Sequence, residues 1–225
     1  MITDNLREIR QAIQDSCAFA HRNPEDVTLI AVTKTVDSEA ARVLVDSGIT
    51  HLAENRVDKL LKKQYDLRDK THLKWHLIGN LQRRKVKSII NEIDFFHALD
   101  SLSLAAEIDK RALKTISCFV EVNISGEETK HGISPEEIES FISQLSSFTN
   151  IKIVGLMTMA PHGANEQELH DIFSRLKILQ ENVRQRTLAH APCTELSMGM
   201  SNDFPIAIEE GSTFIRIGTA LFKDA

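Results

Sequence analysis

The chain has 225 residues, 42% of them apolar, and is therefore long and apolar enough to bury a sizeable core. Its formal charge of −5 at pH 7 gives no electrostatic reason to expect nucleic acid as a partner. No stretch approaches the roughly 20 apolar residues of a membrane span, and the N-terminus shows no apolar signal region. We therefore expect a cytoplasmic protein that does not bind membranes.

An amphipathic helix is predicted first, because Leu6, Ile9, Ile13 and Cys17 are spaced to share one face. The sequence Asn-Pro-Glu-Asp at residues 23–26 ends it. Short β-rich apolar runs then alternate with longer amphipathic segments, which is typical of a parallel sheet with crossover helices. The predicted strands are residues 28–33, 51–53, 74–78, 94–98, 117–123, 151–157, 195–198 and 213–217. The predicted helices are residues 37–47, 56–65, 81–90, 102–113, 135–147, 166–186 and 203–210, with caps at Asp37 and Ser134.

Eight strands with intervening helices predict an α/β fold, a (β/α)8 barrel of the TIM type with an extra N-terminal helix. We expect it to form one domain over residues 1–225. The functional site of such a barrel lies where the strands end, and polar residues follow every predicted strand. They are Lys34, residues 54–56, residues 79–80, His97 with Asp100, Asn123, residues 157–159, residues 197–201 and residues 216–219.

Three cysteines, Cys17, Cys118 and Cys193, are an odd number and have no paired spacing. They predict neither a disulfide framework nor a metal site. We expect these thiols to be packed in the protein rather than reactive.

Lys34 follows the apolar run Leu-Ile-Ala-Val-Thr at residues 29–33. Desolvation at the end of an apolar strand lowers the pKa of an amine, and a neutral amine can attack an aldehyde to form a Schiff base. The alternative is a lysine that has simply reached the surface where its strand ends. Taken without its context, this segment favours the alternative.

The last two predicted strands are followed by loops that suit a phosphate group. Gly218 and Thr219 follow the eighth strand, where a turn would aim backbone N–H groups at an anion. The sequence Ser-Met-Gly-Met-Ser at residues 197–201 follows the seventh strand and adds two hydroxyl groups. Barrels often hold phosphate with these two loops. Gly199 and Gly218 could instead be turn glycines only, but two such loops together favour phosphate.

Three more residues could face a ligand in the same region. Arg216 stands two residues before Gly218, and a guanidinium facing a pyridine nitrogen would keep that nitrogen unprotonated. His76, on the third predicted strand, could contact a ligand or be a satisfied core histidine. Asn55 could bind near an imine or cap the helix that follows it.

Taken in order, the sequence motifs resemble the pyridoxal phosphate homeostasis protein family, whose barrel is similar to the N-terminal domain of alanine racemase. The resemblance runs from about Val27 to Phe222, and the segments Leu-Ser-Met-Gly-Met-Ser and Arg-Ile-Gly-Thr-Ala are together highly specific. The segments that carry it are residues 30–34, 54–56, 75–82, 97–101, 122–125, 155–159, 195–201 and 216–222.

This resemblance implies a monomeric barrel that holds pyridoxal 5′-phosphate (PLP) as a Schiff base on Lys34. The other positions that it implies for cofactor binding are Asn55, His76, Ser197, Met198, Ser201, Arg216, Gly218 and Thr219. It implies no metal ligand and no catalytic residue. The implied role is to store and deliver PLP and to keep the free aldehyde low, with apo-forms of PLP enzymes as partners.

Two other functions remain open at this point. A PLP-dependent racemase or decarboxylase could use the same barrel, but a racemase needs an acid/base group on each face of the cofactor. Tyr65 is the one tyrosine of the chain, and it is predicted on a helix. A barrel enzyme for phosphorylated metabolites would explain the phosphate loops, but it explains Arg216 less well.

Overall fold

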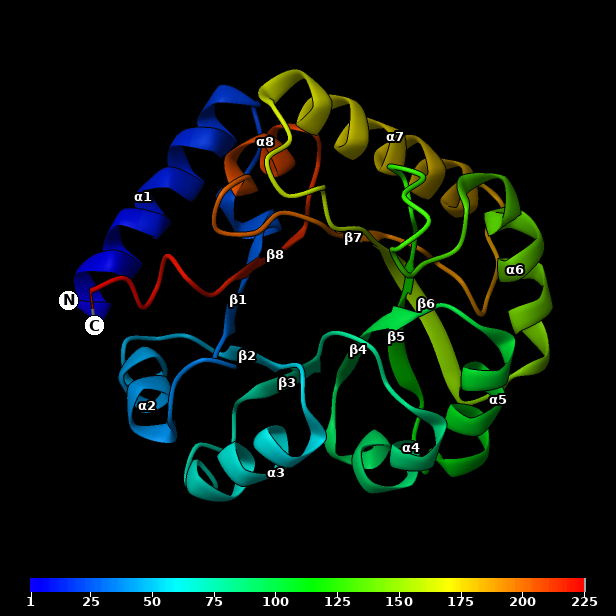
Figure 1. Cartoon of the computed structure of the whole chain (residues 1–225), viewed down its shortest axis with the longest axis horizontal. Helices are drawn as coiled ribbons and strands as arrows, with labels where there is room; N and C mark the ends of the chain where they lie inside the picture. Colours follow the sequence, from blue (N-terminus) through cyan, green and yellow to red (C-terminus); the bar gives the residue numbers. More distant parts are fainter. Residues whose placement is uncertain (225) are drawn as a thin grey trace.

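The computed structural model describes residues 1–224. Eight parallel strands form a closed barrel in the order β1 to β8, with the helices outside it (Figure 1), which confirms the predicted fold. The strands are β1 (Thr28–Val32), β2 (His51–Glu54), β3 (Lys74–Leu77), β4 (Phe95–Leu99), β5 (Ile116–Glu121), β6 (Ile151–Met157), β7 (Glu195–Ser197) and β8 (Phe214–Ile217). The helices are α1 (Ile2–Phe19), α2 (Ser38–Asp46), α3 (Val57–Asp66), α4 (Arg83–Ile89), α5 (Leu102–Arg111), α6 (Ile138–Gln144), α7 (Glu166–Gln185) and α8 (Phe204–Glu209). Among the described residues, no helix has the length and apolar character needed to cross a bilayer.

Local hydrogen bonds accompany the differences at the predicted boundaries. Asp94 lies just outside β4, where its carboxylate accepts a hydrogen bond from the Trp75 amide at 2.8 Å. β5 ends before Asn123, whose side chain instead accepts a hydrogen bond from the Gly126 amide at 3.1 Å. The helix predicted over residues 135–147 is divided into α6 and two flanking 3-10 turns.

Capping side chains fix where several helices begin. The Asp37 carboxylate accepts a hydrogen bond from the Ala40 amide at 2.9 Å, as predicted, whereas the Ser134 side chain caps no helix amide. α7 begins with a full capping box. The Asn165 side chain accepts from the Glu168 amide at 3.0 Å, and the Glu168 carboxylate accepts from the Asn165 amide at 2.8 Å.

Replacing Asn165 with alanine is expected to lower the free energy of unfolding by about 1 kcal/mol, because an amide in the first turn of α7 loses its partner. Ser134→Ala is the matched control and should change the free energy by less than about 0.5 kcal/mol, since Ser134 makes no capping bond. Urea unfolding curves measure both variants. Equal losses in the two variants would contradict the assigned role of the cap.

Aromatic rings fill the inside of the barrel. Phe95, Phe119 and Phe214 converge there, and the centroid of Phe214 lies 5.6 Å from that of Phe95 and 5.5 Å from that of Phe119. The His76 ring stacks on Phe95 at 4.5 Å, and the His97 ring stacks on Phe119 at 4.4 Å. The barrel is therefore a packed core, and a ligand can reach only its two ends.

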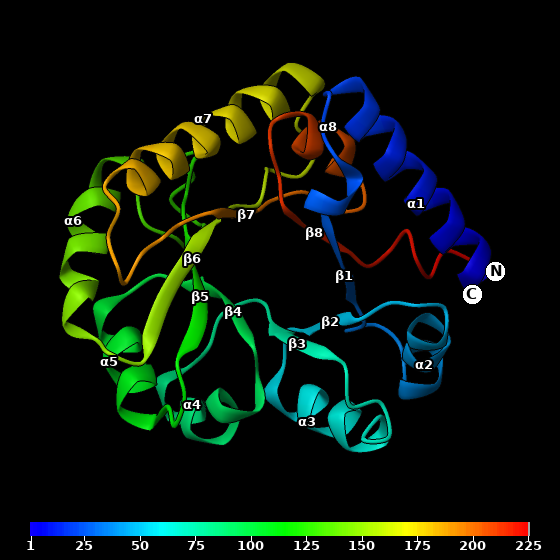
Figure 2. The same ribbon diagram turned by 180° about the vertical axis from the view of Figure 1, so that it is seen from behind.

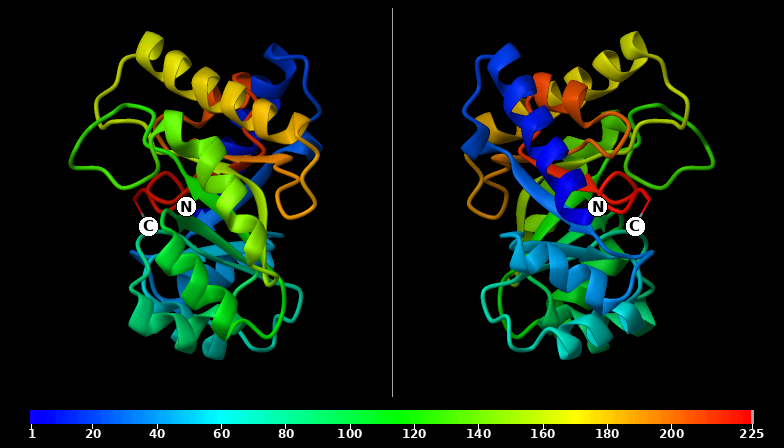
Figure 3. Two further views of the ribbon diagram at one scale, coloured as in Figure 1. Left: turned by 90° about the vertical axis from the view of Figure 1, so that its right-hand side faces the viewer. Right: turned by 90° about the vertical axis from the view of Figure 1, so that its left-hand side faces the viewer.

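Figure 3 distinguishes the two ends of the barrel. The long loops that follow β5 and β6, drawn in green and yellow, project from one end, and the loop before β7, drawn in orange, projects from the other. We call the end at which the strands finish the mouth and the end at which they begin the floor. The mouth is the end at which this fold class places its functional sites.

The barrel closes between β8 and β1. Residues Thr28 to Ala31 pair with Phe214 to Ile217, whereas the β1–β2 register joins Ala31 to Leu52 and Val32 to Ala53. α1 covers this closure beside α8 (Figure 2). The Asn5 side chain of α1 donates hydrogen bonds to the carbonyl oxygens of Leu221 and Lys223, at 3.0 and 2.9 Å. The segments before β1 and after β8 are thus tied directly to each other.

Candidate functional site

Lys34 lies at the mouth, two residues beyond the end of β1. It sits in a turn that is closed by a hydrogen bond from the Val36 amide to the Thr33 carbonyl at 3.2 Å. Its side chain is exposed, rather than in the apolar surroundings that the sequence suggested. No hydrogen bond or ion pair within residues 1–224 engages the Lys34 ammonium, which leaves the amine free for a ligand.

Two lysines of α3 hold the backbone on either side of this turn. The Lys59 ammonium donates a hydrogen bond to the Lys34 carbonyl at 2.8 Å. Lys63 is buried; it donates to the Thr33 carbonyl and forms an ion pair with Glu54, which is fully buried at the end of β2. The Thr33 hydroxyl donates to the same carboxylate at 2.7 Å. The backbone that carries Lys34 is therefore anchored by charged groups.

The two loops predicted to hold phosphate lie together at the mouth. The Ser201 hydroxyl accepts a hydrogen bond from the Ala220 amide at 3.1 Å, which joins the loop after β7 to the loop after β8. Gly218 lies against the end of β1, because a Cβ at this position would be 3.3 Å from the Val32 carbonyl oxygen. The amides of Ser201 and Thr219 bond to no protein group in the described part of the chain. These N–H groups can receive an anion close to Lys34.

Arg216 is buried on β8, two residues before Gly218. Its guanidinium donates hydrogen bonds to the Ser197 hydroxyl and, at 3.2 Å, to the Thr158 carbonyl. Burial lowers the pKa of Arg216 to about 10, while nearby carboxylates act in the opposite direction. Arg216 is therefore a cation at neutral pH, and it can donate hydrogen bonds but not accept them.

Two carboxyl groups, Glu121 and Asp203, act on this cation, and a third, Asp100, acts on Glu121. The sequence pointed only to Asp100. Glu121 is buried at the end of β5, and Asp203 is buried just before α8. Burial raises the pKa of each of the three carboxyl groups, and the charge of Asp100 raises the pKa of Glu121 further. A charged residue that ends the apolar run Cys-Phe-Val of β5 is the sequence signal that would have found Glu121.

Three predicted site residues are buried, and two of them, Ser197 and His76, turn their side chains into the barrel. The Ser197 hydroxyl is bonded to Arg216 and, at 2.8 Å, to the ring of His97. His76 is the satisfied core histidine of the two alternatives, because its ring nitrogens are bonded to His51 and His97, each at 2.8 Å. Met198 is fully buried. Neither ring nitrogen of His76 is free for a ligand.

Asn55 stays at the mouth and is exposed. It does not cap α3, because the N-cap position belongs to Arg56. Its Cβ is 3.6 Å from the position that a Cβ on Gly79 would take, so it stands beside the loop after β3. Tyr65 lies elsewhere, on the outer surface of α3, with the Arg68 guanidinium 4.4 Å above its ring.

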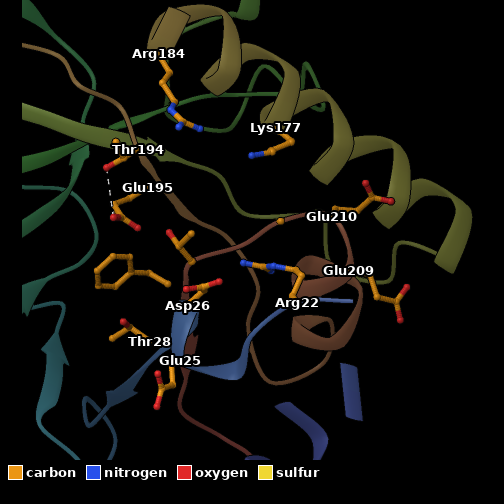
Figure 4. A pocket seen from close by; sticks show the side chains of 13 residues that line it. Arg22, Glu25, Asp26, Thr28, Lys177, Arg184, Thr194, Glu195, Glu209 and Glu210 are labelled. Carbon is orange, nitrogen blue, oxygen red and sulfur yellow. Dashed lines mark hydrogen bonds between the residues drawn. The ribbon is translucent and has the colours of Figure 1, made fainter. Parts of the chain in front are cut away.

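A wide hollow of about 860 Å³ opens at the floor, between α7, α8 and the starts of β1, β7 and β8 (Figure 4). Two of its cations have protein partners: Arg22 donates to the Ile208 carbonyl at 2.6 Å, and Lys177 pairs with Glu181 at 2.7 Å. The hollow lies at the opposite end of the barrel from Lys34. We therefore place the candidate functional site at the mouth, because of the residues that meet there and not because of the volume of a hollow.

Comparison with known proteins identifies the family. Residues 2–225 match the family model described as "Alanine racemase, N-terminal domain". A "Pyridoxal phosphate homeostasis protein" of Aquifex aeolicus (strain VF5) is 39% identical over 224 residues, which cover 98% of this chain and 97% of the relative. The chain belongs to the pyridoxal phosphate homeostasis protein family. A second family relative, from Escherichia coli (strain K12), is 30% identical over 98% of this chain and 95% of its own length.

Solved structures agree with the assignment to the pyridoxal phosphate homeostasis protein family. PipY of Synechococcus elongatus PCC7942 with PLP bound has a TM-score of 0.87 and 33% identity, and the match covers 99% of this chain and 100% of that chain. Alanine racemase of Clostridium difficile 630 has a TM-score of 0.74 at 18% identity, over 97% of this chain and 56% of that chain. The second likeness concerns the barrel fold alone.

Proposed function

We propose that this protein binds PLP at the mouth, as a Schiff base on Lys34, and that it stores and delivers the cofactor and buffers free PLP. The observation that carries the proposal is the position of the Gly218 loop against the end of β1, two residues from Lys34. An exposed amine and amides that bond to no protein group within residues 1–224 thus lie at the same end of the barrel. PLP carries the aldehyde and the phosphate that these two features suit.

The residues at the mouth fit the cofactor group by group. The Lys34 amine would add to the aldehyde with loss of water. The amides of Ser201 and Thr219 would hold the phosphate, and both are free of protein partners within residues 1–224. The bound cofactor supplies an aldehyde carbon activated by a pyridine ring.

Arg216 favours storage over catalysis. Its guanidinium is a cation without an acceptor site, so a pyridine nitrogen that faces it stays unprotonated. An unprotonated ring withdraws electrons less strongly, which weakens the chemistry that PLP enzymes rely on. The tyrosine that could supply a second base, Tyr65, is on the outside of α3.

Borohydride trapping tests the covalent link. The protein mixed with PLP should turn yellow, and reduction should fix the cofactor's mass on the peptide that contains Lys34. Lys34→Ala should lose this adduct completely, whereas Lys59→Ala, which removes a neighbouring lysine of α3, should keep it. A colourless mixture, or an adduct that persists in Lys34→Ala, would contradict the proposal.

The proposed role also includes the partner proteins and the cellular compartment. We propose a monomeric single-domain protein that works in the cytoplasm and hands PLP to apo-forms of PLP enzymes. Racemase activity is the competing function, and it is tested by incubating the PLP-loaded protein with L- or D-amino acids. Optical rotation should stay constant over hours, and rapid racemisation would favour the enzyme.

A further inference from the structure

A row of hydrogen-bonded side chains runs through the barrel from the floor to the mouth. His51 begins β2 at the floor, and its Nδ1 lies 2.8 Å from Nε2 of His76. Nδ1 of His76 lies 2.8 Å from Nε2 of His97, and Nδ1 of His97 lies 2.8 Å from the Ser197 hydroxyl. The Ser197 hydroxyl accepts a hydrogen bond from Arg216. We call these five residues the histidine row.

Burial restricts the protons in this row. His76 and His97 are fully buried, and the loss of water holds the pKa of each well below the ordinary histidine value. At neutral pH each ring is therefore uncharged, with one N–H donor and one bare nitrogen acceptor. Because both rings use both nitrogens, all the hydrogen bonds of the row must point the same way. Only two arrangements are consistent, one toward the mouth and one toward the floor.

Arg216 decides between the two directions. Its guanidinium only donates, so Ser197 accepts from it and still has a hydroxyl hydrogen to place. Within residues 1–224, His97 is the one acceptor bonded to that hydroxyl. If His97 donated instead, a fully buried hydroxyl hydrogen would be left unpaired, which is costly. The row therefore points toward the floor, with the protons of His76 and His97 on Nε2.

His51 terminates the row at a place that solvent can reach. It is half-buried and lines a hollow of about 370 Å³ together with Arg10 of α1. The charged groups that act on it are Lys74 of β3 and Asp94, which precedes β4. Its Nδ1 must stay unprotonated to accept from His76. A proton added there either breaks that bond or turns the whole row around, with His76 and His97 changing tautomer and Ser197 losing its acceptor.

We propose that His51, His76 and His97 are positioning residues that hold Arg216 for the cofactor ring, and that protonation of His51 weakens PLP binding. The coupling to PLP rests on the proposed function, whereas the direction of the row does not. No bond other than N–H and O–H changes in this switch. One proton enters at His51, and each interior ring moves its own proton from Nε2 to Nδ1.

Nitrogen NMR of the cofactor-free protein, labelled with ¹⁵N-histidine at pH 7.5, tests the direction of the row. The Nε2–H tautomer is expected for His76 and His97, with resonances assigned by their loss in His76→Gln and His97→Gln. The Nδ1–H tautomer in both rings would overturn the proposal. This measurement needs no PLP, so it separates a failure of the row from a failure of the proposed function.

Two substitutions of His51 test the coupling to PLP. Glutamine keeps an oxygen that can accept from His76 but does not titrate, and leucine removes the acceptor. His51→Leu should weaken PLP binding at pH 8 about five- to tenfold, the equivalent of one lost hydrogen bond. His51→Gln should bind at pH 8 like the unchanged protein, and it should lose less affinity than that protein between pH 8 and pH 6.

The exposed His72 provides the matched control, because His72→Gln should leave both affinities unchanged. Free PLP titrates in the same range, so the difference between variants is the quantity to compare. Binding by His51→Leu that equals that of the unchanged protein would overturn the coupling. So would a pH dependence of His51→Gln identical to that of the unchanged protein.

Discussion

A Lys63→Met variant is expected to lose about 3–5 kcal/mol in its free energy of unfolding, as other proteins do when one partner of a buried ion pair is removed. Methionine replaces most of the apolar stem of the lysine but leaves the Glu54 carboxylate without its cation. Water cannot compensate, because Glu54 is fully buried. The Thr33 carbonyl, one residue before Lys34, loses one of its two donors as well and keeps the Val36 amide. Urea unfolding at pH 7.5 measures the loss.

The neighbouring residue of α3 supplies the control. Lys62 is exposed and pairs with Asp66 at the surface, at 2.5 Å, so Lys62→Met should change the stability little. Adding Glu54→Gln to Lys63→Met should recover part of the loss, because no buried charge then remains. If Lys63→Met costs no more than Lys62→Met, the buried pair is not what holds this turn.

Acid should destabilise the protein through its buried histidines. Burial lowers the folded-state pKa of His76 and His97, so below the ordinary value of about 6.5 the unfolded chain binds protons that the folded chain does not. Stability is therefore complete above this value and falls as the pH drops below it. Each residue contributes a slope of up to about 1.4 kcal/mol per pH unit. Together they should cost on the order of 3 kcal/mol between pH 7.5 and pH 5.5.

A non-titrating replacement isolates this effect. His97→Gln should remove about half of the excess slope, because glutamine carries no charge in either state. Buried carboxyl groups such as Glu121 and Asp203 have raised pKa values and act in the opposite direction, but they are common to both proteins and cancel in the difference. Free energies of unfolding at pH 7.5, 6.5 and 5.5 give the slopes. The same slope in both proteins would mean that His97 is charged in the folded state.

The elements of the fold follow from patterns that the sequence displays locally. β6 was predicted at its observed bounds, because Ile151–Met157 is a run that is apolar at every position except Lys152. The face of α1 was predicted from spacing, and Leu6, Ile9, Ile13 and Cys17 are indeed buried. The face on which a residue lies follows from the repeat of two residues in a strand or 3.6 residues in a helix. This repeat can be read without knowing which other elements pack nearby.

The site depends on contacts between residues of different strands, and the sequence predicted these contacts only in part. Ser197 was predicted to bind phosphate, but its hydroxyl lies between His97 and Arg216, which come from other strands. The stagger of the strands around the barrel determines which side chains of different strands come into contact. No local sequence pattern encodes this stagger. Lys63 is a different case. Its spacing from Leu60 and Leu67 places it on the buried face of α3, and this signal was available.

The closure between β1 and β8 has a consequence for how the chain is made. β1 is synthesised early, yet residues Thr28 to Ala31 take their longer set of partners from β8, near the other end of the chain. A ribosome delivers Phe214 to Ile217 only after most of the protein has emerged. Until then the edge of β1 that pairs with β8 has no partner, and the Asn5 side chain lacks the carbonyl oxygens of Leu221 and Lys223 to which it donates. The proposed binding site at Lys34, two residues beyond β1, can therefore form only after nearly the whole chain has been synthesised.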